Sequence, residues 1–202
     1  MRTTRVLFLD DERGIAEGMV AALARDGIEV IGIETDVDGA VATAATQQPD
    51  VIVADIDIAG RLALVLPARL DADGPPILWW SGHAGAYRVE AMRAGGVGFV
   101  GKRDGLGMLV DAIRRVAAGE IVWSQSDLRA DRQAPRPPSA REMDVLRLVA
   151  AGRTNREVAD ELGISNRTVG THLQRMYDEY GVGTRQELIL TAYRRGWISR
   201  TV

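Results

Sequence analysis

The segment RVLFLDD, residues 5–11, is a largely apolar run that ends directly at two aspartates. A second segment, VIVADID at residues 51–57, repeats this arrangement around Asp55. Three further apolar runs of similar length lie at residues 29–33, 77–80 and 98–100. Short runs rich in β-branched and aromatic residues, bounded by polar residues, indicate strands. The sequence thus predicts five strands, two of which end at carboxylates.

The stretches between these strands carry apolar residues at helical spacing. Between the first two strands the apolar stripe consists of Ile15, Met19, Ala22 and Leu23. After the fifth strand a second stripe consists of Leu106, Leu109, Val110, Ile113 and Val116. Strands that alternate with helices predict an α/β doubly wound, five-stranded parallel sheet of the flavodoxin-like class. In such sheets, ligands bind outside the carboxyl ends of the strands.

Polar residues stand at these predicted carboxyl ends. The first strand is followed by Asp10 and Asp11, the third by Asp55 and Asp57, the fourth by Ser81 and the fifth by Lys102. Lys102 is the sole lysine of the chain, beside 24 arginines. Its compact ammonium on a flexible stem can reach a single oxygen in a small pocket, unlike a planar guanidinium. We therefore expect Lys102 to contact a carboxylate or a phosphoryl group at this edge.

The carboxylates of Asp10, Asp11 and Asp55 suit a hard divalent cation. Mg²⁺ prefers a few carboxylates together with retained waters, and without a cation the clustered charges would repel one another. A carboxylate held beside such a metal and a lysine can attack a phosphoryl donor as a nucleophile. The sequence therefore predicts Mg²⁺ as a cofactor and Asp55 as a candidate phosphoacceptor.

Residues 1–123 resemble the receiver domain of two-component response regulators, both after the strands and in the segment AGGVGFVGK, residues 94–102. The resemblance implies that Asp55 is phosphorylated. It implies Mg²⁺ binding by Asp10, Asp11, Asp55 and the backbone carbonyl of Asp57, and a switch formed by Ser81, Phe99 and Lys102. The chain departs from the family after Asp55, where IDIAG, residues 56–60, lacks the usual Met-Pro pair. We expect a loop of different shape there.

Composition limits the classes of protein to which the chain can belong. With 202 residues, 46% of them hydrophobic, the chain can form two small domains, and no run approaches the roughly 18 apolar residues of a membrane span. There is no cysteine for disulfides or thiolate metal sites, and His83 and His172 are too far apart in sequence to suggest zinc. We expect a cytoplasmic protein without a signal peptide or membrane contact.

Charge divides unequally along the chain. Residues 1–124 carry 12 basic and 18 acidic residues, whereas residues 125–202 carry 13 and 10. Helical periodicity disappears over residues 124–138, where PRPP at residues 135–138 stiffens the backbone. We therefore expect an exposed linker at residues 124–138, between a regulatory domain at 1–123 and a more basic domain at 139–202 that binds nucleic acid.

The last 64 residues, 139–202, contain the start and stop signals of four short helices. Three Ser/Thr-x-x-Glu capping boxes begin at Ser139, Thr154 and Thr184, and Ser165 or Asn166 can cap a fourth helix. Glycines that can end the first three helices are Gly152, Gly163 and Gly181 or Gly183. A small all-α domain is predicted, in which the second and third helices have the spacing of a helix-turn-helix.

The predicted third helix, residues 166–180, has one apolar and one polar face. The apolar face, expected to pack inward, carries Val169, Leu173, Met176, Tyr177 and Tyr180. The polar face is nearly without acidic residues until Asp178, and such a face can enter the major groove of DNA.

Residues 139–202 resemble the LuxR-type DNA-binding domain, through SARE (139–142), GRTNREVA (152–159) and ISNRTVGTHL (164–173). Joined to a receiver, this domain resembles regulators of the NarL/FixJ type. The resemblance implies base contacts from Gly170, Thr171 and Gln174, and phosphate contacts from Thr154, Asn155, Arg167, Thr168 and Arg175. It further implies a homodimer contact through Leu188, Ile189, Ala192 and Tyr193. Lysine is common in the family at position 170, so base choice is expected to rest on Thr171 and Gln174.

The main hypothesis is a phosphorylation-controlled transcription factor, not an enzyme. A sensor histidine kinase or small phosphodonor modifies Asp55, and the C-terminal helices then bind double-stranded promoter DNA as a homodimer, with RNA polymerase as a candidate partner. An alternative makes the receiver a phosphorylation-independent dimerisation or ligand-sensing module, because the loop after Asp55 is altered. A third reading is a phosphatase with an aspartate nucleophile, in which the Asp-x-Asp pair would follow the first strand rather than the third.

Overall fold

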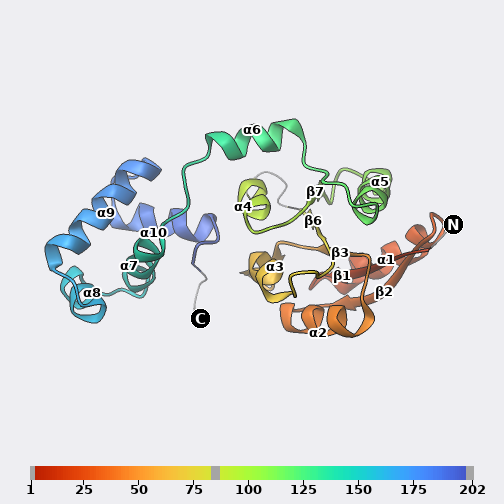
Figure 1. Cartoon of the computed structure of the whole chain (residues 1–202), viewed down its shortest axis with the longest axis horizontal. Helices are drawn as coiled ribbons and strands as arrows, with labels where there is room; N and C mark the ends of the chain where they lie inside the picture. The colour runs from red at the N-terminus through yellow and green to blue at the C-terminus, as the bar shows by residue number, and fades with distance from the viewer. Residues whose placement is uncertain (1–2, 83–86, 199–202) are drawn as a thin grey trace. The chain divides into compact units, whose positions relative to one another are not determined.

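Five parallel strands form the centre of the first unit in the computed structural model, which describes residues 3–82 and 87–198. The strands are β1 (Thr4–Leu9), β2 (Ile28–Glu34), β3 (Val51–Ala54), β6 (Ile77–Ser81) and β7 (Gly98–Gly101). They lie in the order β2-β1-β3-β6-β7, and every neighbouring pair is parallel (Figure 1). The predicted strands and their doubly wound arrangement are confirmed. His83 lies outside the described residues.

Helices cover both faces of this sheet (Figure 1). One face packs against α1 (Arg13–Ala24) and α5 (Leu106–Ala117), and the other against α2 (Val37–Gln47), α3 (Leu66–Arg69) and α4 (Arg88–Arg93). Because successive strand residues point to opposite faces, Trp79 and Trp80 enter different cores. Both are buried, and Trp80 meets Phe8 edge to face with ring centroids 5.7 Å apart. The two tryptophans thus anchor both layers at one point of the sheet.

A short hairpin follows Asp55, where the sequence predicts an altered loop. It consists of β4 (Asp57–Ile58) and β5 (Arg61–Leu62), which pair antiparallel. The turn residues Ala59 and Gly60 have φ angles of 51° and 77°, the left-handed region that a two-residue hairpin turn requires. A 3₁₀ turn, η1 (Ala63–Val65), then leads into the short α3. The strands of this hairpin are only two residues long, too short for an alternating pattern to reveal them in the sequence.

The segment expected to be a linker contains a helix, α6 (Gln125–Gln133). Its sequence, QSDLRADRQ, has no apolar stripe, which is why helical periodicity did not reveal it. The chain divides into two units between Arg132 and Gln133, so almost all of α6 belongs to the first unit. The predicted linker spans this division, but its first half is ordered structure.

The second unit consists of four helices around their own core. They are α7 (Ala140–Ala150), α8 (Asn155–Leu162), α9 (Asn166–Tyr180) and α10 (Arg185–Arg194). All three predicted capping boxes are formed, Ser165 caps α9, and Gly163 and Gly181 end α8 and α9 in the left-handed conformation. The inward face of α9 is confirmed, since Val169, Leu173 and Met176 are buried. None of the described helices is both long and apolar enough to cross a lipid bilayer.

Replacement of Gly96 tests how tightly the α4 side of the sheet is packed. A Cβ atom at Gly96 would overlap Trp79 Nε1, which donates to Ala91 O at 3.1 Å. We expect Gly96→Ala to lower the free energy of unfolding by about 2–4 kcal/mol, because it overpacks the core and strains a buried hydrogen bond. Urea titration followed by tryptophan fluorescence measures this loss. Gly18→Ala in α1, where an added Cβ meets nothing within 4 Å, should instead stabilise the protein.

Glu142 should make the second unit sensitive to acid. The Arg136 guanidinium lowers the pKa of Glu142 from 4.5 to about 2, although burial opposes the shift. Because the folded pKa is depressed, the stabilisation is present above pH 4.5 and is lost as the pH falls towards 2. We expect Glu142→Gln to cost about 2 kcal/mol at pH 7 and to flatten this acid dependence.

Urea titrations of a fragment of residues 133–202 between pH 2 and 7 would measure the Glu142 effect. Glu157→Gln changes the equivalent glutamate of an exposed capping box and should have a smaller effect. Equal acid dependence in both variants would contradict the assignment to the Arg136 contact.

Candidate functional site

Lys102 lies between two aspartates at the carboxyl edge of the sheet. Its Nζ is 2.7 Å from Asp10 Oδ2 and 2.7 Å from Asp55 Oδ2. Asp10 is fully buried, and Asp55 and the Lys102 side chain are 8% and 12% exposed. The exposed carboxylate of Glu12 lies 3.9 Å from Nζ. One ammonium therefore serves two buried carboxylates, and the cluster holds more negative than positive charge.

The register of β1 and β3 brings the two aspartates together. Leu9 lies opposite Ala54, and Asp55 N donates to Leu9 O at 2.8 Å. The next residue of each strand, Asp10 and Asp55, therefore leaves the sheet at the same level. Asp55 Oδ1 accepts the backbone N–H of Ile56 at 2.6 Å, which fixes the orientation of its carboxylate. The other oxygen, Oδ2, is the one that faces Lys102.

The cluster shifts the protonation of its members. Burial raises the pKa of Asp10 above its ordinary range, although the hydrogen bond with Lys102 opposes this shift. Burial alone would lower the pKa of Lys102, but hydrogen bonds to Asp10 and Asp55 together outweigh it, and the pKa is raised. The two shifts have different causes, since burial dominates at Asp10 and the two carboxylates dominate at Lys102. Lys102 therefore stays an ammonium.

The β4–β5 hairpin closes over this edge and is tied to it by Asp11. Asp11 Oδ2 accepts the backbone N–H of Ala59 at 2.9 Å, within the hairpin turn. Asp11 thus stands beside the cluster, but one of its oxygens is committed to the loop. The hydrogen bond satisfies the N–H of a non-glycine residue in the left-handed region.

The hairpin register also determines what Asp57 presents to Asp55. Ala63 N donates to Ile56 O at 2.7 Å, and in an antiparallel pair the next facing residues exchange no hydrogen bonds. The backbone groups of Asp57 are therefore not used by the ladder, and its N–H lies 3.4 Å from Asp55 Oδ1. Its side-chain Oδ1 is shielded from solvent without a hydrogen-bond partner in the described part of the chain. Asp57 Oδ1 thus has unmet coordination, and the Asp57 carbonyl is left out of the hairpin ladder.

These donors fit a hard divalent cation. Within residues 3–82 and 87–198, no three side chains of the metal-binding types already form a cage. The available groups are the carboxylates of Asp10 and Asp55, which share one ammonium, the carbonyl of Asp57, which the hairpin ladder does not use, and Asp57 Oδ1, which has no hydrogen-bond partner in the described residues. Oxygen ligands and uncompensated negative charge are what Mg²⁺ requires.

Ser81 and Phe99 border the cluster on β6 and β7. Ser81 pairs with Gly101, and Lys102 N donates to Ser81 O at 3.0 Å, so Ser81 sits beside the base of the lysine. Ser81 is 1% exposed. Phe99 is three residues before Lys102 and lies in the core on the α4 side. The residues predicted to form the phosphorylation site thus lie together at the carboxyl edge of the sheet, and Phe99 lies beside them in the core under α4.

Two neighbours of the site escaped the sequence analysis. The Trp80 ring lies under the lysine, with Nζ 5.2 Å from the ring centroid. Arg88, the first residue of α4, places its guanidinium carbon 4.3 Å from the centroid of the Phe99 ring. Strand alternation allowed either side for Trp80, and nothing in the spacing of Arg88 pointed to Phe99.

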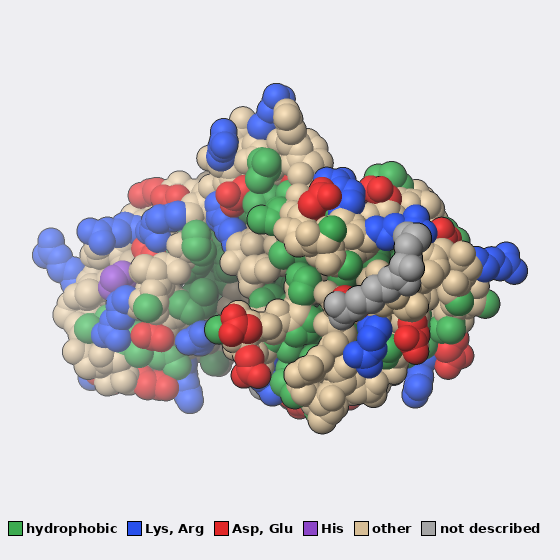
Figure 2. All heavy atoms as spheres, turned by 45° about the vertical axis from the view of Figure 1, so that its right-hand side comes forward, with side chains coloured by type: hydrophobic (Ala, Val, Ile, Leu, Met, Phe, Trp, Pro, Cys, Tyr) green, Lys and Arg blue, Asp and Glu red, His purple; other side chains and the backbone are tan. Residues whose placement is uncertain are grey.

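The residues predicted to contact DNA lie on α8, on α9 and at their caps. Thr154, Arg167, Thr168, Thr171, Gln174 and Arg175 are exposed, while Asn155 and Gly170 are partly exposed. Some of their polar groups are already used: Thr154 forms its capping box, and Thr171 Oγ1 donates to Arg167 O at 3.0 Å. On the face of the molecule that Figure 2 shows, basic and acidic side chains are interspersed.

Two residues outside the predicted set orient members of the α8–α9 face. Arg185 on α10 donates to Asn155 Oδ1 at 3.2 Å, which leaves the amide NH₂ of Asn155 as its donor. Asp178 Oδ1 accepts from Gln174 Nε2 at 2.9 Å, one turn along α9. The i,i+4 spacing of Gln174 and Asp178 could have revealed the second contact, whereas the first depends on tertiary packing.

The predicted dimer contact on α10 requires a correction. Leu188 and Ala192 are fully buried in the core of the second unit, so they hold α10 in place and do not face a partner. Ile189 and Tyr193 are partly exposed, and Leu190, which was not predicted, is 48% exposed. Of the four residues that the family resemblance assigns to a dimer contact, Leu188 and Ala192 thus pack into the core of their own unit.

Comparison with known proteins matches both units. Residues 6–114 match the family model of the response regulator receiver domain, and residues 138–192 match that of the luxR family of bacterial regulatory proteins. The transcriptional regulatory protein DesR of Bacillus subtilis is 29% identical over 95% of this chain and 98% of its own.

Two solved structures are also similar. The response regulator ChrA of a heme-sensing two-component system is 30% identical, with a TM-score of 0.54 over 98% of this chain and all of its own. RcsB, solved as two dimers bound to two parallel DNAs, shares the fold with a TM-score of 0.62 at 19% identity, over 93% of this chain and 96% of its own.

Removal of the lysine charge tests the electrostatics of the cluster. We expect Lys102→Met to lower the free energy of unfolding at pH 7 by about 2–3 kcal/mol, because two buried carboxylates lose their common cation. Mg²⁺ should recover more stability in this variant than in the wild type, because a cation replaces the ammonium. Urea titrations with and without Mg²⁺ measure both effects. Arg114→Met, which removes a half-exposed ion pair with Asp26, is the control and should change little.

Proposed function

The chain belongs to the response regulators that join a receiver domain to a LuxR-type DNA-binding domain, and we propose that phosphorylation of Asp55 controls its binding to promoter DNA. The observation that carries this proposal is the contact of Lys102 with Asp55 at 2.7 Å, in a cluster with excess negative charge. A carboxylate so placed has a cation ready to stabilise a transferred phosphoryl group.

Asp55 is the proposed nucleophile because its carboxylate is fixed at the sheet edge and is still reached by solvent. One of its oxygens forms the bond to phosphorus as the bond to the donor's leaving group breaks. Lys102 then moves with its charge towards the phosphoryl oxygens, for which a compact ammonium is suited. Ser81 is buried and its backbone carbonyl accepts from Lys102 N, and its hydroxyl is the proposed hydrogen-bond donor to the new group.

Mg²⁺ is the proposed cofactor of this step. Asp10, Asp55 and the backbone carbonyl of Asp57 would hold it, with Asp11 at the margin and the Asp57 carboxylate oxygen close by. When bound, the metal would neutralise charge on the transferring phosphoryl group. The roles of the protein residues follow from their contacts: Asp11 holds the hairpin through Ala59, and the hairpin in turn presents Asp57 to the site.

The α8–α9 face is the proposed DNA-binding surface. Thr171 and Gln174 would contact bases, and Arg167, Arg175, Thr168 and the N-terminus of α8 at Thr154 and Asn155 would contact phosphates. Because the Thr171 hydroxyl donates within the helix, its methyl group is the part best placed to meet thymine. Gly170 adds no side-chain contact. Recognition therefore rests on few donors, and a second copy of the chain is proposed to supply the other half of the site.

The proposed partners are a sensor histidine kinase or small phosphodonor, promoter DNA and RNA polymerase, in the cytoplasm. Exposed Leu190, with Ile189 and Tyr193, is the revised candidate for the homodimer contact. The alternative, in which the receiver does not respond to phosphorylation, is favoured by one observation, the β4–β5 hairpin in place of the family's usual loop.

Phosphorylation and its effect on DNA binding can be tested together. We expect incubation with Mg²⁺ and acetyl phosphate to give a phosphoryl adduct in the intact mass of the wild type and no adduct in Asp55→Asn. The phosphorylated protein should bind genomic fragments selected with it about 5- to 150-fold more tightly than the unmodified protein does, which is the range of typical coupling energies of about 1–3 kcal/mol.

Asp57→Asn is the matched control, because it alters a carboxylate of the same loop that is not the proposed acceptor. It should retain the adduct, with a changed dependence on Mg²⁺. Equal DNA affinity with and without a demonstrated adduct would favour the phosphorylation-independent alternative. Absence of the adduct, under conditions that modify another receiver domain, would sink the main proposal.

A further inference from the structure

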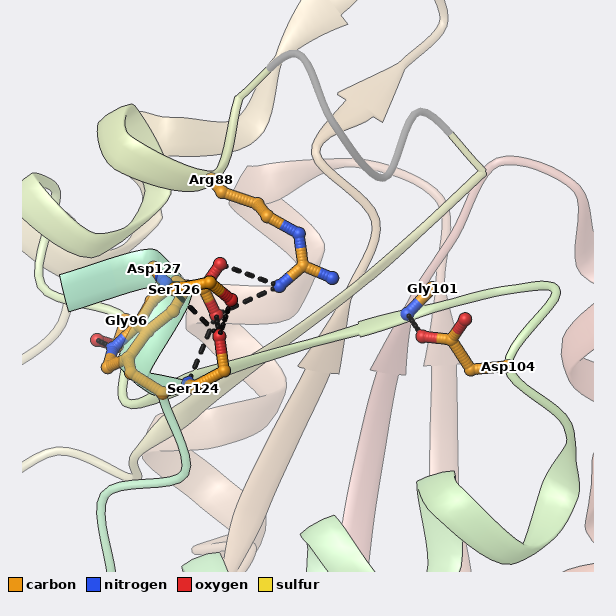
Figure 3. Close-up of polar contacts among 8 residues, drawn as sticks. Arg88, Gly96, Gly101, Asp104, Ser124, Ser126 and Asp127 are labelled. Atoms are coloured by element: carbon orange, nitrogen blue, oxygen red, sulfur yellow. Dashed lines mark hydrogen bonds and ion pairs between the residues drawn. The ribbon is translucent and has the colours of Figure 1, made fainter. Parts of the chain in front are cut away.

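The helix α6 is held on the first unit by polar contacts. Of its nine residues only Asp127 is buried, and Leu128 is 43% exposed. Arg88 Nη1 lies 3.0 and 2.9 Å from the two carboxylate oxygens of Asp127, and Arg93 Nε lies 2.6 Å from Asp131 Oδ1. Both arginines belong to α4, so α6 is docked on α4 by ion pairs (Figure 3 shows the first of them).

Asp127 both begins α6 and attaches it. Ser124 Oγ accepts the backbone N–H of Asp127 at 3.1 Å, while Asp127 Oδ2 accepts the N–H and the hydroxyl of Ser124 at 3.1 and 2.7 Å (Figure 3). This is a capping box at the N-terminus of the helix. The Asp127 side chain is only 7% exposed, so its carboxylate depends on Arg88 for charge compensation. The start of α6 and its docking therefore rest on one buried carboxylate.

Arg88 connects this carboxylate to Phe99. Its guanidinium carbon lies 4.3 Å from the Phe99 ring centroid, within the range of a cation–π contact. Its side chain is 27% exposed and Phe99 is 6% exposed, so the guanidinium covers the ring. A planar guanidinium lies flat on a ring and still donates at its edge. The Phe99 ring thus supports Arg88 in the orientation that meets Asp127.

A third contact ties the entrance of α6 to the same region. Trp123 Nε1 donates to Gly96 O at 3.0 Å, just before β7 begins. The segment that precedes α6 is therefore anchored next to the strand that carries Phe99 and leads to Lys102. A movement of that strand would therefore alter two contacts that hold α6, the Trp123–Gly96 hydrogen bond and the stacking of Arg88 on Phe99.

We propose that Arg88 is a positioning residue that makes the docking of α6 depend on the position of Phe99. While the ring lies under the guanidinium, Arg88 faces Asp127 and α6 is held as a helix. When the ring moves away, Arg88 loses the ring contact, and its pair with the buried Asp127 weakens. That this movement follows phosphorylation rests on the proposed function; the coupling of Phe99 to α6 does not.

Loss of docking would melt α6. A nine-residue polar helix is marginal in water by itself, because its hydrogen bonds barely repay nucleation. An unpaired buried carboxylate is also costly, so Asp127 would leave the surface. The non-helical segment that joins the two units would then lengthen at its N-terminal end by residues 124–133. The receiver would thus control the length of the tether on which the DNA-binding unit is carried.

Amide hydrogen exchange of the full-length protein, read by mass spectrometry on peptides that cover residues 124–133, tests this coupling. We expect Arg88→Gln and Phe99→Leu each to speed exchange in α6 by about tenfold, because both remove support for docking. Peptides from β1 and β3 should keep their wild-type exchange and so report an intact fold. Arg69→Gln, which removes an exposed ion pair with Asp38, is the matched control and should leave α6 unchanged.

Arg88→Lys separates the coupling from simple attachment. An ammonium keeps the charge but cannot lie flat on the ring, so Arg88→Lys should speed α6 exchange about as much as Phe99→Leu does, whereas attachment by charge alone would leave α6 protected. Addition of Phe99→Leu to Arg88→Lys should then change α6 exchange little, although the same change speeds exchange in the wild type. If Phe99→Leu leaves α6 protected, or acts equally in both backgrounds, the proposal is overturned.

Phosphorylation forms the last arm of the experiment. With Mg²⁺ and acetyl phosphate, α6 exchange should rise in the wild type and not in Arg88→Lys, and intact mass reports the adduct in the same samples. An adduct with unchanged α6 exchange would overturn the link between phosphorylation and α6, and would leave the proposed function standing. Absence of the adduct would defeat the proposed function, while the Phe99 and Arg88 variants still decide the coupling.

Discussion

One ammonium shared by two buried carboxylates is the constraint on which the receiver depends. Lys102 compensates Asp10 and Asp55 only in part, so the carboxyl edge of the sheet is held together yet remains short of positive charge. The excess of negative charge favours binding of a cation at this edge. It also leaves the Lys102 ammonium able to move towards a new negative group. The sheet supplies the geometry, because parallel strands deliver successive loops to one edge.

Much of this arrangement could be predicted from the sequence. Local patterns among residues close together in the chain predict the five strands and the polar residues at their ends. They also predict the helix caps of the second unit. Polar segments were harder. α6 has no apolar stripe and owes its order to Arg88 and Arg93, which are far from it in sequence. Apolar periodicity cannot predict a helix that is stabilised by ion pairs with residues far away in the sequence.

The errors in the site have the same origin. Leu188 and Ala192 have the spacing of a contact face, and spacing alone does not say whether that face meets the protein's own core or a second chain. The hairpin after Asp55 was expected only as a change of shape. Its role in presenting Asp57 depends on which backbone groups the ladder uses, and that is a property of register. The sequence patterns therefore identified the reactive side chains, whereas the residues that they contact could be assigned only from the packing of the folded chain.

The lone lysine has a consequence for the covalent chemistry of the protein. Every other basic side chain that keeps its charge at neutral pH is an arginine, so the chain has one side-chain amine, at its proposed phosphorylation site. The raised pKa of Lys102 keeps that amine protonated and therefore unreactive towards acylating reagents. Acylation would exchange the ammonium for a neutral amide and leave two carboxylates facing each other. The pairing that holds the edge together thus also protects the protein from such damage.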